Sequence, residues 1–397
     1  MIAPRRPVFR FTGLASVVGA LASLAACGGG GEHGAPGSGI EVHAGRVPPA
    51  PPEQPALDPA AVRARAKKVF GVLPQEFPSP SNPLTEAKIN LGRMLYYDGR
   101  LSLTGEISCN SCHKLDAYGV DNLPTSPGHD GSFGSRNSPT VYNAAGQLAQ
   151  FWDGRSGDVE DQAKGPILNP IEMGMADEAS VVQVLASIPG YVEAFGAAFP
   201  DNDDPVSYDN LAMAIGAFER RLATPAPIDA WLAGDDSVLS EQALAGLQLF
   251  MDSDCQSCHS GYNYGGSMYQ KLGTVKPWPG LKDDGRATIT GDERDRFTFK
   301  VPILRNIDKT GPYLHDGSIA SLEDMVAKMV AHQTQRPGPL TAEEMANMLA
   351  FLASLTGELP AEYIAEPKLP EGGMVAAIPV KSVNQPSAPA DGDPVEG

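Results

Sequence analysis

The sequence predicts a mainly α-helical fold, with two related units in tandem and long loops. Three observations lead to this prediction. Apolar residues recur with helical spacing in seven segments, strand-type alternation is nearly absent, and the pattern C-x-x-C-H occurs twice, each time after a similar apolar helix. The chain has 397 residues, of which 42% are hydrophobic, so it is long enough to bury two cores.

The N-terminus has the pattern of an export signal. Three arginines in the first ten residues precede an apolar run that is too short for a good membrane-spanning helix. The run ends in LAAC (residues 24–27), which resembles a bacterial lipobox, where the cysteine becomes the lipidated first residue. We therefore expect a lipoprotein-type signal peptide at 1–27, a lipid anchor on Cys27 and a periplasmic location. An ordinary signal peptide with an unmodified cysteine is the alternative.

Two segments are expected to flank the folded body without folding themselves. Residues 28–58 and 366–397 are rich in glycine, proline and small polar residues, which cannot bury enough apolar area to form a core. We expect a flexible linker in the first segment and a flexible tail in the second.

Seven segments of the body have the apolar spacing of amphipathic helices. Thr341 and Glu344 have the spacing of a capping box at the start of the last one. The seven segments are 59–71, 84–98, 178–188, 208–223, 240–252, 321–333 and 341–355.

An internal repeat divides the body into two units. CNSCH (109–113) and CQSCH (255–259) each follow a similar apolar helix and an aspartate. Further along each copy, RNSPTVYNAAGQLAQFWDG is echoed by LRNIDKTGPYLHDG. The repeat predicts an N-terminal domain at 59–224 and a C-terminal domain at 225–365.

A C-x-x-C-H pattern in an exported chain is typical of covalent attachment of a c-type haem. The two cysteines can form thioethers to the two vinyl groups of one haem, and the adjacent histidine can reach the iron. Zinc would require further ligands at similar spacing, and a redox dithiol would require a βαβ context. The sequence therefore predicts two cytochrome c-like haem domains. Their haem-binding residues would be Cys109, Cys112 and His113 in the first, and Cys255, Cys258 and His259 in the second.

The sixth ligand of each iron separates an electron carrier from an enzyme, because a haem that handles peroxide must be able to open that position. His129, in a loop rich in proline and glycine, is a candidate at the first haem, and a surface histidine is the alternative. At the second haem, Met325 and His332 each share a helix face with Met329, and spacing alone selects none of the three.

Residues from about 60 to 360 resemble the bacterial di-haem cytochrome c peroxidases. The resemblance implies an enzyme that reduces hydrogen peroxide to water with electrons from a small soluble donor, a cytochrome c or a cupredoxin. It also implies a homodimer and one calcium ion between the domains. The segments that show it are CNSCHKLDAYGVDNLPTSPGH, RNSPTVYNA, AQFWDGR, QAKGP, CQSCHSG, FKVPILRN and PYLHDG.

The resemblance also implies roles for single residues. His129 corresponds to the removable distal ligand of the first, peroxide-reducing haem, and Trp152 to an aromatic bridge between the haems. Gln162 and Glu172 fall at the distal-pocket amide and carboxylate. Met329 falls at the distal ligand of the second haem, whose potential a methionine raises.

Asn137, Thr310 and Pro312 fall where the family binds calcium, the last two through backbone carbonyls, and oxygen donors suit that ion. Taken without the resemblance, Trp152 is a core aromatic and Glu172 a surface charge, while Asn137 and Thr310 are ordinary turn residues. We assign His315, in PYLHDG, to structure near the second haem.

Two other functions stay open at this stage. One is a non-enzymatic di-haem electron carrier, and the other is a related enzyme that matures a tryptophan-derived quinone in a partner protein. In that second branch a tyrosine replaces the methionine ligand, so Met329 favours the peroxidase. The net charge of −18 does not suit a nucleic-acid partner, and we expect membrane contact only through the lipid anchor.

Overall fold

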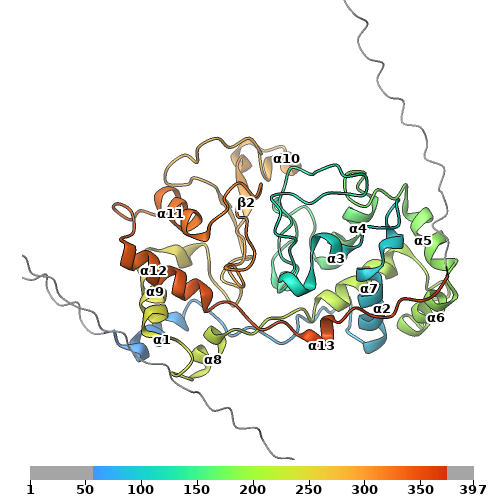
Figure 1. The fold of residues 1–397 in the computed structure, drawn as a ribbon, viewed down its shortest axis with the longest axis horizontal. Helices are drawn as coiled ribbons and strands as arrows, with labels where there is room; N and C mark the ends of the chain where they lie inside the picture. Colours follow the sequence, from blue (N-terminus) through green and yellow to red (C-terminus); the bar gives the residue numbers. More distant parts are fainter. Residues whose placement is uncertain (1–56, 373–397) are drawn as a thin grey trace, which may run out of the picture. The chain divides into compact units, whose positions relative to one another are not determined.

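Helices form most of the regular structure in residues 57–372, the part of the chain that the computed structural model describes (Figure 1). The signal peptide with Cys27, nearly all of the expected linker and most of the tail lie outside this part. The helices are α1 (Pro59–Ala66), α2 (Glu86–Tyr97), α3 (Cys109–Cys112), α4 (Val159–Leu168), α5 (Glu178–Ala186), α6 (Pro189–Ala198), α7 (Tyr208–Glu219), α8 (Pro227–Ala233), α9 (Glu241–Asp252), α10 (Ala287–Thr290), α11 (Leu322–Gln333), α12 (Ala342–Ala353) and α13 (Ala361–Ile364). The strands are β1 (Tyr269–Lys271) and β2 (Thr298–Lys300), and short 3-10 turns occur at 99–101, 115–117, 144–146, 255–257 and 293–295.

The seven predicted helices are all present, as α1, α2, α5, α7, α9, α11 and α12, and the mainly helical fold class is confirmed. The predicted capping box is formed at the start of α12. There Thr341 N–H donates to the Glu344 carboxylate at 2.8 Å, and Glu344 N–H donates to Thr341 Oγ1 at 3.2 Å. The helical assignments succeed because each depends on a local apolar spacing that packing then uses.

Several elements were not predicted from the sequence. Helix α4 contains Pro166, which interrupts its apolar spacing, and α6 and α8 are short helices that begin with a proline. Strands β1 and β2 pair antiparallel, with Tyr269 opposite Lys300, but three residues are too few to show alternation.

The described residues bury two large hydrophobic cores. The first core lies between α2, α4, α5, α6 and α7, and the second lies between α1, α8, α9, α11 and α12. The first and last described helices pack on the core of the other half of the chain. Helix α1 contributes Val62 and Ala66 to the second core, and α13 contributes Ile364 to the first (Figure 1). The first core thus takes its buried residues from 89–222 and from Ile364, and the second takes them from 62–70 and 226–355. The domain division at 59–224 and 225–365 stays a prediction.

Corresponding helices of the two units pack through a glycine. A Cβ added to Gly92 of α2 would lie 1.8 Å from the Ala214 carbonyl oxygen of α7. A Cβ added to Gly246 of α9 would lie 1.9 Å from the Asn347 carbonyl oxygen of α12. Each glycine thus lets two helix backbones touch, and each lies on the helix that precedes a C-x-x-C-H pattern in the chain. The repeat seen in the sequence is therefore also a repeat in packing.

Within residues 57–372, no single helix is long and apolar enough to cross a membrane. Helices α5 and α6 meet the length and composition requirements only as a pair that is bent by 105°, and both contribute side chains to the first core.

We predict that Gly92→Ala lowers the free energy of unfolding by about 1–3 kcal/mol, because the added methyl group forces α2 away from α7. The matched control is Gly196→Ala in α6, where an added Cβ meets no atom within 4 Å. That substitution should raise the free energy of unfolding by up to about 1 kcal/mol, since it removes a flexible residue from a helix. Urea unfolding of the haem-loaded protein measures both, and equal effects would contradict the packing described here.

Candidate active site and haem-binding cavities

Each C-x-x-C-H pattern lines a large cavity of its own. Cys109, Cys112 and His113 line the first cavity. The second cavity is lined by the pattern at 255–259. Each cavity is thus a hollow whose wall carries two cysteines and a histidine beside mainly apolar side chains, as a large apolar cofactor requires.

In the first cavity, the single turn of α3 places both cysteines and His113 on one wall. The thiols form no disulfide, and burial raises the pKa of Cys112 to about 11. Burial lowers the pKa of His113, so its imidazole is neutral near pH 7, as an iron ligand must be. The Tyr96 hydroxyl donates to the His113 carbonyl at 2.8 Å and fixes the backbone of this residue.

In the second cavity, a hydrogen bond orients the histidine. The Nδ1 atom of His259 lies 3.2 Å from the Tyr264 carbonyl oxygen, which can only accept, so Nδ1 carries the proton. This leaves Nε2 as the basic nitrogen. Burial lowers the pKa of His259 to about 4, which again keeps the ring neutral.

These walls fit a covalently bound haem. Each cavity offers two unpaired thiols and one neutral imidazole against a largely apolar lining. In the described part of the chain, no three His, Cys, Asp or Glu side chains gather as a site for a bare metal ion. The donor set thus suits an iron that brings its own equatorial ligands.

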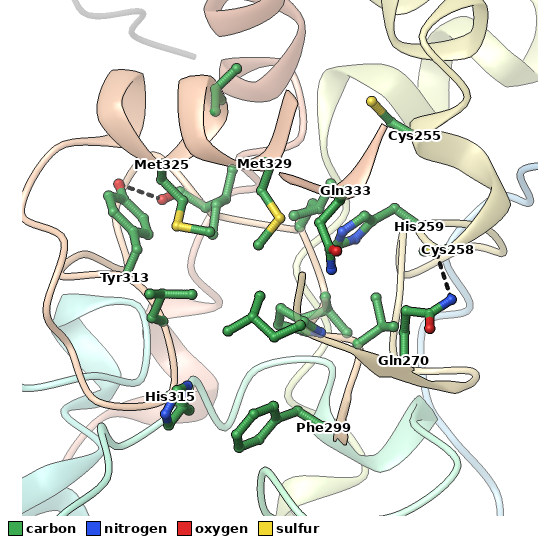
Figure 2. A pocket seen from close by; sticks show the side chains of 18 of the residues that line it. Cys255, Cys258, His259, Gln270, Phe299, Tyr313, His315, Met325, Met329 and Gln333 are labelled. Carbon is green, nitrogen blue, oxygen red and sulfur yellow. Dashed lines mark hydrogen bonds between the residues drawn. The ribbon is translucent and has the colours of Figure 1, made fainter. Parts of the chain in front are cut away.

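Helix α11 provides the candidate distal ligands of the second cavity. Met325, Met329 and Gln333 point from this helix into the cavity, and His259 faces the same space (Figure 2). His332, the second candidate from the sequence, is not in this wall. Its ring lies 5.1 Å from that of Trp278, and its Nδ1 atom lies 3.3 Å from the Lys276 carbonyl oxygen.

Trp152 lies in the wall of both cavities, together with Phe151. Its indole N–H donates to the Asn137 carbonyl at 2.9 Å, and the Asn137 N–H donates to the His315 carbonyl at 2.8 Å. The His315 ring lies 6.4 Å from the Trp152 ring and stacks on Phe299 at 4.2 Å. A series of aromatic rings therefore occupies the region between the cavities.

Two polar residues named from the sequence, Gln162 and Glu172, line the first cavity only. Helix α4 carries Gln162 and is fixed to α7 by a buried ion pair between Glu160 and Arg220, with both oxygens engaged at 2.7 Å. Asn169 Nδ2 donates to Glu172 Oε1 at 2.8 Å.

The pKa of Glu172 is raised. Burial is the main cause, and the nearby Arg155 guanidinium opposes it only in part. A carboxyl group whose pKa is shifted toward neutrality is suited to accept and return a proton.

His129 lies beside the first cavity rather than in its wall. Its N–H donates to the Glu172 carbonyl at 2.8 Å, and its Nε2 atom lies 3.1 Å from the Pro170 carbonyl oxygen. Pro127 and Phe133 form a bridge at the base of this loop, and Phe133 is 61% exposed. The loop thus contacts residues 170–172 through one backbone hydrogen bond and through the ring of His129.

The three residues proposed for calcium also lie together. Asn137, Thr310 and Pro312 all line the second cavity, close to where the two halves of the chain meet. Asn122 Nδ2 donates to the carbonyls of Lys309 and Gly311, at 3.1 and 2.9 Å, on either side of Thr310. Calcium binding itself stays a prediction.

Comparisons with known proteins agree with this site. A family model described as di-haem cytochrome c peroxidase matches residues 86–237. The chain is 43% identical to cytochrome c551 peroxidase of Pseudomonas aeruginosa, over 76% of this chain and 88% of that protein. It is 47% identical to cytochrome c551 peroxidase of Nitrosomonas europaea, over 67% and 78%. The chain belongs to the di-haem cytochrome c peroxidase family.

The chain is also similar, at lower identity, to MauG and to a MauG-like protein. The methylamine utilization protein MauG of Methylophilus methylotrophus is 34% identical, over 71% of this chain and 86% of that protein. The crystal structure of a MauG-like protein associated with microbial copper homeostasis superposes with a TM-score of 0.66, at 29% identity, over 75% of this chain and 97% of the other.

Sequence reasoning missed several side chains of this peroxidase site. Arg155 and Glu219 line the first cavity, and Gln270, Lys300 and Gln333 line the second. Arg155 and Lys300 fall within AQFWDGR and FKVPILRN, so those segments already contained a signal. The other three lack one, because a glutamine or glutamate on a helix or strand has no distinctive local pattern.

We predict that Met329→His lowers the midpoint potential of the second haem, because imidazole stabilises ferric iron relative to a thioether. Met325→His is the matched control, since Met325 lies one turn away in the same cavity wall. Spectroelectrochemical titration measures both variants. An unchanged potential in the first variant with a lowered one in the second would assign the ligand to Met325.

Proposed function

We propose that this protein reduces hydrogen peroxide to water at the first cavity, with electrons that a small soluble donor, a cytochrome c or a cupredoxin, delivers at the second. The observation that carries the proposal is the position of Trp152 in the wall of both cavities, with Glu172 in the first cavity only. This asymmetry gives one cavity an acid–base group and leaves the other with apolar methionines.

Two c-type haems would supply the redox chemistry, one attached at Cys109 and Cys112 and the other at Cys255 and Cys258. The proposed domains are the N-terminal one at 59–224 and the C-terminal one at 225–365, in tandem and with long loops. Two separate cores and two equivalent glycine contacts support this division. His113 and His259 would be the proximal ligands, and Met329 the distal ligand of the second haem.

Glu172 would move the proton that peroxide cleavage requires. Its Oε1 atom is held by Asn169, so Oε2 is available to accept a proton from hydrogen peroxide and return it to the departing oxygen. A raised pKa favours both halves of this transfer near pH 7. Gln162, on the rigidly fixed α4, would orient the peroxide by hydrogen bonds from its amide.

His129 would act as a removable ligand of the first haem. Its loop carries the exposed ring of Phe133, and it is joined to residues 170–172 by one backbone hydrogen bond, from the His129 N–H to the Glu172 carbonyl, and by the His129 ring nitrogen beside the Pro170 carbonyl. Segments with so few apolar contacts open at low free-energy cost. The same backbone contacts join the loop to Glu172, so movement of His129 and placement of the acid–base group would be coupled.

The remaining assignments concern surroundings and partners. The pattern of a signal peptide and the LAAC segment in the sequence support a periplasmic enzyme that is anchored by a lipid on Cys27. Asn137, Thr310 and Pro312 would bind one calcium ion where the halves of the chain meet, and the enzyme would be a homodimer. Two methionines in the α11 wall favour the peroxidase branch over quinone maturation.

We predict that Glu172→Gln keeps both haems and reduces peroxide turnover by about 10²–10⁴-fold, because an amide cannot relay the proton. Glu193→Gln is the control, since Glu193 is an exposed carboxylate on α6, outside both cavities. Turnover with reduced cytochrome c and a pyridine haemochrome assay check the two parts. Unimpaired turnover in Glu172→Gln would remove the proposed acid–base role.

We predict that His129→Gly turns over peroxide without prior reduction, because the position that His129 would occupy stays open. The unaltered enzyme should instead need one-electron reduction first, with loss of the low-spin spectrum of the first haem. Stopped-flow kinetics and electron paramagnetic resonance of the oxidised and half-reduced proteins measure this. A first haem that stays six-coordinate after half-reduction would favour the electron carrier.

A further inference from the structure

Lys300 is a buried cation in the wall of the second cavity. It ends β2, and only 6% of its surface is exposed. Among the described residues it is the one lysine or arginine that lines this cavity, whereas Arg136 and Arg155 line the first. Asp254 is the one carboxylate of the second cavity wall, and it forms no ion pair with Lys300 within the described residues.

Within residues 57–372, the ammonium group of Lys300 has fewer hydrogen-bond acceptors than it has N–H donors. Gln147 Oε1 is its single hydrogen-bond acceptor within residues 57–372, and no carboxylate there forms an ion pair with it. An ammonium group has three donors, and a buried one without a counter-ion carries a large desolvation cost. Burial accordingly lowers the pKa of Lys300 to about 7. Within residues 57–372 the ammonium group therefore has one acceptor for its three N–H donors and no counter-ion.

A haem bound at Cys255 and Cys258 would bring two propionate carboxylates into this cavity. We propose that the Lys300 ammonium binds one propionate of the second haem, on the side of that haem that faces Trp152. The inference rests on the proposed attachment of a haem at this pattern. The proposal adds Lys300 to the second site, as a residue whose charge influences the midpoint potential of the second haem.

The backbone around Lys300 fixes where this pair would lie. The Lys300 N–H donates to the Trp152 carbonyl at 2.8 Å, and Gln147 precedes Trp152 in the same segment. Gln147, which accepts from the ammonium group, lines the second cavity, and Trp152, which accepts from the backbone N–H of Lys300, lines both cavities. Held beside this segment, the ammonium would neutralise a propionate on the Trp152 side of the second cavity.

The expected effect on the potential has a definite sign. A buried propionate without its cation leaves a negative charge near the iron, and that charge stabilises the ferric state over the ferrous state. Lys300 should therefore keep the potential of the second haem high. This works in the same direction as a methionine ligand.

Potentiometric titration of Lys300→Gln in the full haem-loaded protein tests this role. At a fixed applied potential, the ratio of reduced to oxidised second haem should fall by at least tenfold, which is about 59 mV for a one-electron couple. Lys300→Arg, which keeps the charge, should change the ratio by much less. Lys271→Gln is the matched control, because Lys271 is an exposed lysine on the adjacent strand β1. Its loss should change the ratio less than about twofold.

A crystal structure of the unaltered oxidised protein tests the contact itself, even if Lys300→Gln fails to fold. A Lys300 Nζ atom within 4.0 Å of a propionate oxygen of the second haem is the expected result. Propionates that both point away from Lys300, or a Lys300→Gln shift no larger than that of Lys271→Gln, would overturn the inference. A haem count of one per chain would instead overturn the proposed function, so the two failures are distinguishable.

Discussion

The wall shared by the two cavities is the constraint on which the rest of this structure depends. Trp152 lines both cavities, and its indole N–H donates to the Asn137 carbonyl. The backbone N–H of Asn137 in turn donates to the His315 carbonyl. Arg136 reinforces the same wall, because its guanidinium pairs with Asp153 and with Asp283, each at 2.6 Å. Both sites are therefore built against one rigid partition, and a change there would affect both.

Burial controls the ionisation of the groups around each cavity. It keeps His113 and His259 neutral, raises the pKa of Glu172, and lowers that of Lys300. The first cavity wall holds two guanidinium and two carboxyl groups, whereas the second is mainly apolar and has Lys300 and Asp254 as its Lys, Arg, Asp or Glu side chains. Two cavities that derive from one repeated pattern thus differ most in their charges, which is where two haems with unlike tasks should differ.

A firmly fixed helix and a less firmly attached loop both border the first cavity. Helix α4 is fixed by the Glu160–Arg220 pair, and Asn82 Nδ2 adds a further bond to Glu160 at 2.8 Å. The loop of His129, in contrast, packs on residues 171–172 through its backbone, with Gly128 so close to Ile171 that an added Cβ would lie 1.7 Å from its carbonyl oxygen. The first cavity is therefore bordered by a helix that a buried ion pair fixes and by a loop whose Phe133 is exposed.

The sequence by itself determined the features that depend on local spacing. Seven amphipathic helices, the Thr341 capping box and the two C-x-x-C-H patterns are all readable within a few residues, and the helices and the capping box recur in the structure. Helix α4 was not predicted because Pro166 interrupts its apolar spacing, and β1 and β2 were not predicted because each has only three residues.

Only the tertiary structure decided which side chains share a cavity. Sequence spacing alone does not select the distal ligand among Met325, Met329 and His332. The packing of α11 directs the two methionines into the cavity and places His332 against Trp278. Lys300 has no distinctive local pattern in the sequence, and only the fold buries it and places its ammonium group against Gln147. The physical reason is that burial and charge compensation depend on segments far apart in the chain, which no local pattern records.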